Sequence, residues 1–481
     1  MPRRVVRVRP GVPAPLRAGL DRLDQQLGIP ADFPPEVLDE ARRTAQGGTS
    51  GGVAGTTPEL DATDLELVTI DPAGSLDLDQ ALHLARTGGG YRVHYAIADV
   101  AAFVVPGSAL DAETHRRGET LYAPDGRTPL HPAVLSEGAA SLLPGQERPA
   151  LLWRIDLDPD GEMTDARVVR ARVRSRAKLD YAGVQAALDS GTAAGMLELL
   201  PVIGRLRQRR EVARGGVSLN APEQEIRVVD GTWTLGYRVA LPVEDYNAQI
   251  SLLTGMAAAQ LMLRGRVGLL RTLPPAEPAA LWRLRRTAAA LGISWPRRMG
   301  YPTFVRRLDG AQGPQAAMVN ACATLFRGAG YAAFNGAVPE LHVHGALAAP
   351  YAHVTAPLRR LGDRYASEIC VALCAGADVP EWVSAALDAI PAELAASDRR
   401  AKAYERGIVG LAEALVLSGR VGESFAASVV EADAKRGGVV MLREPAVDAR
   451  VSGAGLELGA EVRVRVEAVD LVRGAVTLAL A

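Results

Sequence analysis

TIDPAGSLDLDQAL, residues 69–82, joins two apolar runs through a loop that carries three aspartates. The residues before the loop predict a strand over 65–70, and Asp71 closes that strand. Asp77 and Asp79 follow a turn of Pro, Gly and Ser. In an extended backbone, residues two apart point to the same side, and the turn can fold Asp71 back beside them. We therefore expect three carboxylates to converge in this loop.

Three crowded carboxylates are costly unless a cation lies among them. Hard oxygen ligands favour Mg²⁺, with Mn²⁺ as a second possibility, and such an ion can activate water for phosphodiester cleavage. A Ca²⁺ EF-hand is excluded, because Leu82 stands where the loop needs Gly and Gly88 stands where it needs Glu. The alternative is an Asp-rich turn whose side chains bond to the local backbone. The spacing alone leaves both interpretations open.

A second cluster is YAHVTAPLRRLGDRYA, residues 351–366. It places Arg359 and Arg360 at the predicted start of a helix, and a helix N-terminus with adjacent guanidiniums suits a phosphate. The alternative is a solvated arginine pair bonded to Asp363 at helical spacing. A later AYERG segment puts Glu405 inside a helix and indicates nothing by itself.

Strands come first in the body of the chain and helices follow, which predicts an α+β fold. The predicted strands are 65–70, 81–85, 91–96 and 151–157, and the predicted helices are 196–214, 247–263, 278–291, 314–327, 361–373 and 399–417.

Different patterns mark the two ends of the chain. Helical patterns at 16–27 and 35–46 and a Gly-rich linker at 47–57 predict a small helical module over 1–58, either RNA-binding or purely a packing unit. The catalytic body is then 59–418. Five short strands within 419–481 predict an OB-type barrel.

One strand of the predicted barrel contains VRVRVEAVD, which has the alternation of a half-buried strand. Its valines are expected to face the barrel core, and Arg463 and Arg465 are expected to face solvent. Phe425, near the start of the first barrel strand, is a candidate for stacking on a base.

Composition limits the class of protein. The 54 basic and 55 acidic residues give a net charge of −1, so a nucleic-acid site must be local. Three cysteines cannot form a disulfide framework, which fits a reducing compartment. The first ten residues have no signal-peptide pattern, and 247–263 carries too many polar residues for a membrane span. We expect a soluble, cytoplasmic protein with no membrane partner.

These segments, in this order, resemble the ribonuclease II and ribonuclease R family, the RNB-domain exoribonucleases. The resemblance covers roughly residues 60–417. It rests on linked motifs: TID with the aspartate loop, AIADV at 96–100, LYAP at 121–124, PLHP at 129–132, TAPLRR at 355–360 and the later ER. It implies an RNB catalytic domain that hydrolyses RNA from its 3′ end to nucleoside 5′-monophosphates with Mg²⁺, on a single strand threaded into a closed channel.

The resemblance also assigns roles to residues. Asp71, Asp77 and Asp79 match three of four family aspartates around the metal and the scissile phosphate, and the neutral Gln80 stands in the fourth place. Arg359 matches the arginine that contacts the phosphate. The implied substrate-binding residues are Tyr122, which matches an aromatic residue that stacks on the terminal base, and Arg360 and Glu405.

Three functions follow as hypotheses. The first is a monomeric, Mg²⁺-dependent 3′-to-5′ exoribonuclease that acts on single-stranded 3′ ends. The second is a catalytically degenerate member of the family that only binds RNA, which the substitution at Gln80 suggests. The third is a metal-dependent phosphodiesterase with another substrate, and the OB-type barrel argues against it.

Overall fold

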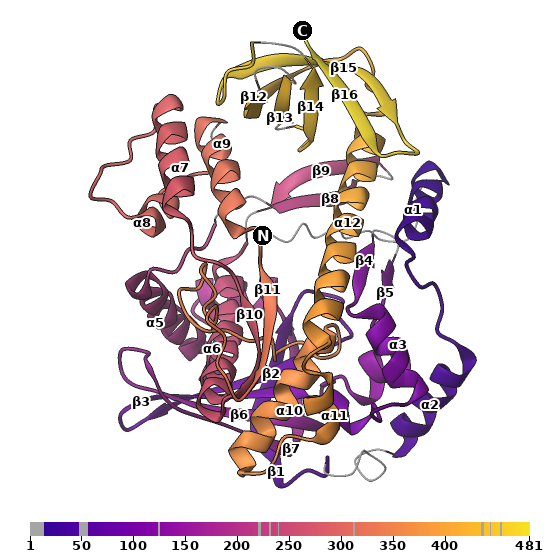
Figure 1. Ribbon diagram of the computed structural model, residues 1–481, viewed down its shortest axis with the longest axis vertical. Helices are drawn as coiled ribbons and strands as arrows, with labels where there is room; N and C mark the ends of the chain where they lie inside the picture. Colours follow the sequence, from indigo (N-terminus) through magenta and orange to yellow (C-terminus); the bar gives the residue numbers. More distant parts are fainter. Residues whose placement is uncertain are drawn as a thin grey trace.

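The computed structural model describes most of the chain (Figure 1). The described residues are 14–47, 56–123, 126–219, 223–229, 232–238, 240–310, 313–433, 437–442, 444–452 and 455–481.

A closed five-stranded barrel forms the base of the α+β body, residues 59–418. Its strands are β1 (Leu60–Asp71), β2 (Gln80–Thr87), β3 (Gly90–Ala98), β6 (Glu147–Leu157) and β7 (Met163–Asp180). The strands pair in antiparallel order from β1 to β7, and a parallel β1–β7 pairing closes the barrel, with Asp71 opposite Asp180. The aspartate loop therefore leaves and re-enters the barrel at one end.

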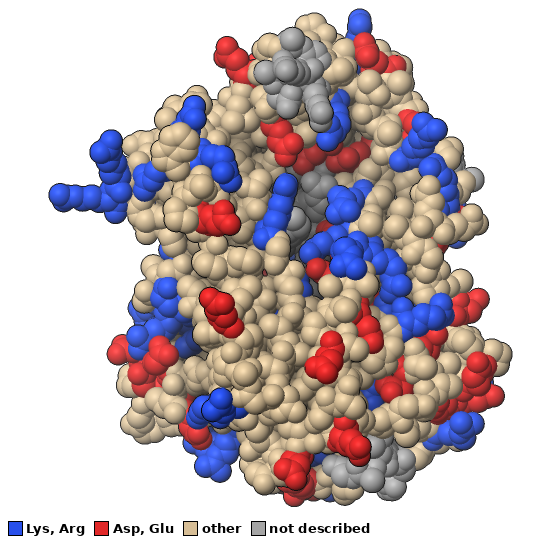
Figure 2. Space-filling model, in the orientation of Figure 1, with Lys and Arg blue, Asp and Glu red and all other residues tan. Residues whose placement is uncertain are grey.

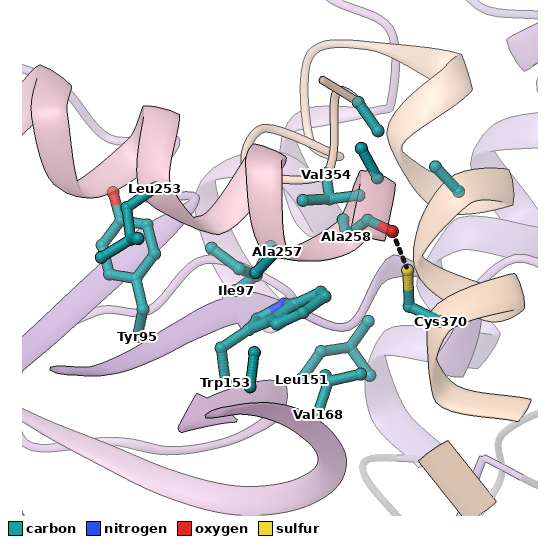
Figure 3. Close-up of a cluster of buried hydrophobic side chains, with 14 of the residues drawn as sticks. Tyr95, Ile97, Leu151, Trp153, Val168, Leu253, Ala257, Ala258, Val354 and Cys370 are labelled. Carbon is teal, nitrogen blue, oxygen red and sulfur yellow. Dashed lines mark hydrogen bonds between the residues drawn. The ribbon is translucent and has the colours of Figure 1, made fainter. Parts of the chain in front are cut away.

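The barrel packs through apolar side chains against the long helix α6 (Pro242–Gly265). Trp153 and Ile97 are fully buried, and Figure 3 shows them facing α6. Helix α10 (Leu361–Ala375) packs on α6, and its Cys370 Sγ donates to the carbonyl of Ala258 at 3.8 Å. This cysteine behaves as a small core residue.

The long helix α12 (Ile390–Leu417) runs from the α+β body to the C-terminal barrel (Figure 1). Beside it lies the two-stranded sheet of β10 (Val267–Thr272) and β11 (Gly330–Asn335). The segment between these two strands forms a helical lobe of α7 (Pro278–Ala290), α8 (Tyr301–Val305) and α9 (Gly313–Ala323).

The N-terminal helices α1 (Ala14–Leu27) and α2 (Pro35–Gly47) dock on the body at separate places. Leu16 and Leu20 of α1 are buried in the cluster that contains Leu411 of α12, and Arg22 donates to the carbonyl of Val472 at 2.8 Å. Helix α2 packs on α3 (Ala109–Arg117). The buried apolar face of α1 favours the packing role for this module.

The C-terminal strands form a second closed barrel in the order β12-β13-β14-β16-β15, which confirms the predicted OB-type domain. Val464 and Val466 are fully buried while Arg463 and Arg465 are exposed, as the alternation predicts. The strands are β12 (Ser424–Asp433), β13 (Gly437–Leu442), β14 (Asp448–Ser452), β15 (Glu461–Asp470) and β16 (Ala475–Leu480).

Phe425 is not a stacking residue, contrary to the sequence-based expectation. It is 7% exposed and belongs to the apolar cluster that the barrel shares with α1 and α12. The Arg420 guanidinium covers its ring, with 4.4 Å from the guanidinium carbon to the ring centre. A ring in this position cannot receive a base.

The sequence patterns missed several elements. Strand β7 is 18 residues long and was not predicted, because arginines alternate along it with Ala and Val. Arg170 is 2% exposed and forms ion pairs with Asp99 and with Glu368 of α10. The other α-helices and strands that were missed are α3, α4 (Tyr181–Asp189), α8, α11 (Glu381–Ala386), β4 (Leu121–Ala123), β5 (Gly126–Thr128), β8 (Glu223–Val229), β9 (Thr232–Arg238), β10 and β11.

Within the described ranges, no helix has the length and apolar character needed to cross a membrane.

Candidate active site

Asp79 joins the two clusters that the sequence singled out. Its side chain is buried, Oδ1 accepts the backbone N–H of Leu358 at 2.8 Å, and Oδ2 lies 3.2 Å from Arg359 Nε. Burial raises the pKa of Asp79 to about 7, because loss of solvent outweighs the attraction of the guanidinium. The aspartate loop and the start of α10 therefore form one site.

Asp71 lies at the end of β1, where the strand leaves the barrel. Its Oδ2 is buried and receives no hydrogen bond from the described residues. Burial raises the pKa of this carboxyl to about 6, while Arg359 opposes the rise. A buried carboxylate oxygen without a donor is a place where a cation or a water molecule would be favourable.

Asp77 is held by side chains from the β4–β5 hairpin. Arg127 Nη1 lies 2.7 Å from Asp77 Oδ1, and the Tyr122 hydroxyl donates to Asp77 Oδ2 at 3.3 Å. Tyr122 is 48% exposed, so its ring remains available for stacking. Arg127 also pairs with Glu137. Arg127 was not predicted from the sequence, because no local pattern sets an arginine of a short hairpin apart.

Gln80 begins β2, and its amide oxygen accepts a hydrogen bond from the Tyr95 hydroxyl. Tyr95 rises from β3 and is 1% exposed, and Figure 3 shows its ring beside Leu253 of α6. A carbonyl oxygen has two lone pairs, so one remains on Gln80 for another ligand. Tyr95 is a second residue of the site that sequence reasoning missed.

The chemistry of these donors fits a hard divalent cation. Carboxylate and amide oxygens are the ligands that Mg²⁺ and Mn²⁺ prefer, and the unpartnered oxygen of Asp71 would be satisfied by such an ion. The described part of the chain contains no group of three or more carboxylate, imidazole or thiol side chains already arranged around one point. The expected convergence of Asp71, Asp77 and Asp79 is thus not seen as a preformed cluster among the described residues. The residues fit a divalent cation only by the chemistry of their oxygen atoms.

Arg360 has a different environment from Arg359. Its guanidinium forms a bidentate pair with Asp363, at 2.9 Å from Nε and 2.7 Å from Nη2. The sequence left open the possibility that the arginine pair bonds to Asp363 at helical spacing. In the structure, Arg360 makes this contact.

Arg360 and Glu405 both line a polar cavity of about 370 Å³, which also contains residues that the sequence did not indicate. Lys402 Nζ lies 2.7 Å from Asp398, and Arg271 lies 3.6 Å from the same carboxylate. On the face drawn in Figure 2, Lys and Arg side chains gather around a central hollow. The cavity is lined by Gly118, Glu119, Arg271, Leu273, Phe326, Ala329, Tyr331, His344, His353, Arg360, Leu394, Ser397, Asp398, Ala401, Lys402 and Glu405.

The raised pKa values give the site a pH dependence of definite sign. Below pH 6 both Asp71 and Asp79 keep a proton, because their pKa values are about 6 and about 7 instead of 3.8. We expect Mn²⁺ affinity, measured by calorimetry, to rise between about pH 5 and pH 8 as these protons leave. In Asp71→Asn only the upper part of this rise should remain. An affinity that stays constant over this range would contradict the assignment.

The same shifts affect stability without metal. Only the folded state holds these protons above pH 3.8, so the two groups destabilise the metal-free fold as the pH rises through about 6 and about 7.

Two domain families match the chain. The RNB domain matches residues 60–375, which is more than half of the chain. The RNase II-type exonuclease C-terminal S1 domain matches residues 423–481.

Two of the similar proteins are bacterial proteins named ribonuclease R. Ribonuclease R of Acidithiobacillus ferrooxidans is 37% identical over 170 residues, which are 34% of this chain and 37% of that protein. Ribonuclease R of Escherichia coli is 28% identical over 321 residues, 63% of this chain and 39% of that protein. This chain thus spans well under half the length of these relatives.

Among solved structures, the apo form of Mycoplasma genitalium RNase R has a TM-score of 0.85 at 19% sequence identity. The likeness covers 97% of this chain and 78% of that chain. At this level of identity, the likeness shows the fold.

Proposed function

Because this chain belongs to the RNB domain family, we propose that it is a Mg²⁺-dependent exoribonuclease that shortens RNA from the 3′ end and releases nucleoside 5′-monophosphates. The observation that carries the proposal is the contact between Asp79 and Arg359. It places an acidic loop suited to a cation beside a guanidinium suited to a phosphate, although 280 residues separate the two in sequence.

The proposed reaction assigns two roles to the residues of the site: holding the cation and contacting the phosphate. Asp71, Asp77, Asp79 and Gln80 would hold Mg²⁺, which when bound lowers the pKa of water and stabilises charge on the phosphate. Arg359 offers a fixed positive charge to the phosphoryl oxygens, and its contact with Asp79 holds it in position. With these roles, the proposed reaction does not need any of the described histidines as a general base.

The cavity is the proposed path of the strand. Arg360 and Glu405 line it together with Arg271 and Lys402, so a phosphate can replace Asp398 as the partner of the last two. Tyr122 contacts Asp77 while its ring stays half exposed, which suits stacking on the terminal base. Stacking tolerates any base, so the enzyme would be insensitive to sequence.

A labelled substrate tests the proposal. An oligoribonucleotide labelled at its 5′ end should shorten one nucleotide at a time with Mg²⁺ and stay intact with a chelator, and the small products should be 5′-monophosphates. Internal cuts would contradict exonucleolytic action. Tight RNA binding without any shortening would establish the RNA-binding alternative.

Tyr122→Ala should change the length at which degradation stops. The last few nucleotides make few contacts, and loss of one stack removes roughly 1–3 kcal/mol of binding. We expect longer end products on a sequencing gel. Tyr122→Phe keeps the ring and loses only the hydrogen bond to Asp77, so its end products should match those of the wild type. If Tyr122→Ala also gives wild-type lengths, the stacking role is wrong.

Arg463→Ala combined with Arg465→Ala should weaken binding of long RNA. Both side chains are exposed on β15. The salt dependence of binding should fall by roughly 0.7 log units for each phosphate that the protein no longer neutralises. Point substitutions are preferable to deleting the barrel, which shares its core with α12.

The control for this prediction is Arg167→Ala, which removes a 67% exposed arginine side chain from β7. Single-turnover cleavage at saturating RNA should change little in either variant. Unchanged affinity and salt slope in the double variant would show that this face of the barrel does not bind RNA.

A further inference from the structure

Asn247 lies near the start of α6 and contacts the end of β1. Its side chain is 9% exposed. Nδ2 donates to the Tyr181 hydroxyl at 3.2 Å and to the backbone carbonyl of Ile70 at 3.4 Å. Oδ1 is buried and receives no hydrogen bond from any described residue. The amide is therefore satisfied on its nitrogen only.

The orientation of this amide is fixed by chemistry. The carbonyl of Ile70 can only accept a hydrogen bond, so the nitrogen of Asn247 must face it, and the oxygen is the atom left over. A buried acceptor without a donor costs roughly 1–3 kcal/mol. Such a cost calls for an explanation, and an ion or a water molecule bound at the oxygen would supply one.

The two unpartnered oxygens belong to one neighbourhood. Asn247 bonds to Ile70, and the next residue is Asp71, whose Oδ2 is the other buried oxygen without a donor. Tyr181 contacts the Asn247 amide and lies close enough to Asp71 for the carboxyl to help raise the pKa of its hydroxyl, after the larger effect of burial. The amide oxygen of Gln80, in contrast, already accepts a hydrogen bond from the Tyr95 hydroxyl, so it is not one of the unpartnered oxygens.

Resting on the proposed function, we propose that Asn247 is a further ligand of the divalent cation, through Oδ1, together with Asp71. Asn247 supplies a neutral oxygen from α6, so the ion is held from both the barrel and the helix packed on it. This contribution adds an oxygen ligand at a site that lacks the fourth carboxylate, but it adds no negative charge. Tyr181 and the Ile70 carbonyl are positioning groups that hold the amide in the ligating orientation.

The test is direct measurement of Mn²⁺ affinity in the full chain without RNA, by calorimetry and by the paramagnetic signal of free Mn²⁺. Asn247→Ala should raise the dissociation constant by roughly tenfold or more. Gln249→Ala is the matched control, because Gln249 is also buried on α6 with an unpartnered Oε1. Its Nε2 donates to Glu211 of α5 (Leu199–Arg214) at 2.7 Å. We expect its Mn²⁺ affinity to match that of the wild type.

Asn247→Asp separates ligation from folding. The new carboxylate keeps an oxygen at the same place but meets the Ile70 carbonyl without a proton to donate, so thermal stability without metal should fall. A ligand role predicts Mn²⁺ affinity equal to or above that of the wild type despite this loss. Affinity that falls together with stability, or equal losses in Asn247→Ala and Gln249→Ala, would overturn the proposal.

Failure of the wider function gives different results. If the wild-type protein binds no Mn²⁺, the metal-dependent function and the role of Asn247 are both wrong. If Mn²⁺ binds and depends on Asn247 while RNA stays intact, the ligand assignment holds and the exoribonuclease proposal fails.

Discussion

Asp79→Asn will bind RNA nearly as well as the wild-type protein and will cleave it slower by roughly three orders of magnitude or more, because several kcal/mol of transition-state stabilisation depend on the metal-binding charge. Asparagine keeps an oxygen for the N–H of Leu358 but removes the negative charge that faces Arg359. In the proposed function, RNA affinity comes from the arginines that line the cavity and from stacking on Tyr122, and not from Asp79. Single-turnover cleavage and filter binding on the same substrate measure the two effects.

The matched control is Asp111→Asn. Asp111 is also buried and ion-paired, to Arg364 at 2.5 Å, but it lies on α3 outside the aspartate loop. We expect this variant to lose stability while the cleavage step of the folded protein changes little. If RNA affinity of Asp79→Asn falls as far as its activity, Asp79 is a structural residue.

Arg359→Ala should lower the rate of the cleavage step by roughly 10²–10³-fold, the typical effect of removing one preorganised charge from a transition state. The change also removes the guanidinium that faces the buried carboxylate of Asp79, so the pKa of Asp79 should rise above its value of about 7. The pH profile of the remaining activity should therefore move to higher pH.

Arg359→Lys keeps the charge without the planar guanidinium and should recover part of the rate. Its pH profile should lie between those of the wild type and Arg359→Ala. A large loss of rate with an unshifted pH profile would show that Arg359 acts without influencing Asp79.

Local alternation and motif order predicted the parts of the fold that have a repeated pattern. The barrel valines Val464 and Val466 face inward because a strand alternates its faces. The two chemical clusters were recognisable because carboxylates and arginines are concentrated in short segments. The contact between Asp79 and Arg359 joins two segments that are far apart in sequence. The family resemblance implied that they share one site, but no local sequence pattern predicts the contact.

The features that could not be predicted from the sequence depend on packing between distant elements. Phe425 is an aromatic residue on a strand of an OB-type barrel, but it is buried in an apolar cluster and Arg420 lies over its ring. Tyr95 and Asn247 look like ordinary strand and helix residues until β3 and α6 bring them beneath the aspartate loop. When a polar residue lies on a buried face, the neighbouring sequence does not show whether it has a structural or a functional role.

The most direct test of exonucleolytic action compares linear and circular RNA of one sequence, labelled internally and incubated with the full chain and Mg²⁺. We predict that linear RNA is degraded to 5′-monophosphates while circular RNA stays intact, because the active site acts on a 3′ end that reaches it through the cavity. Degradation of the circle at a comparable rate would contradict the proposed function, and so would survival of both forms under conditions in which the protein binds them.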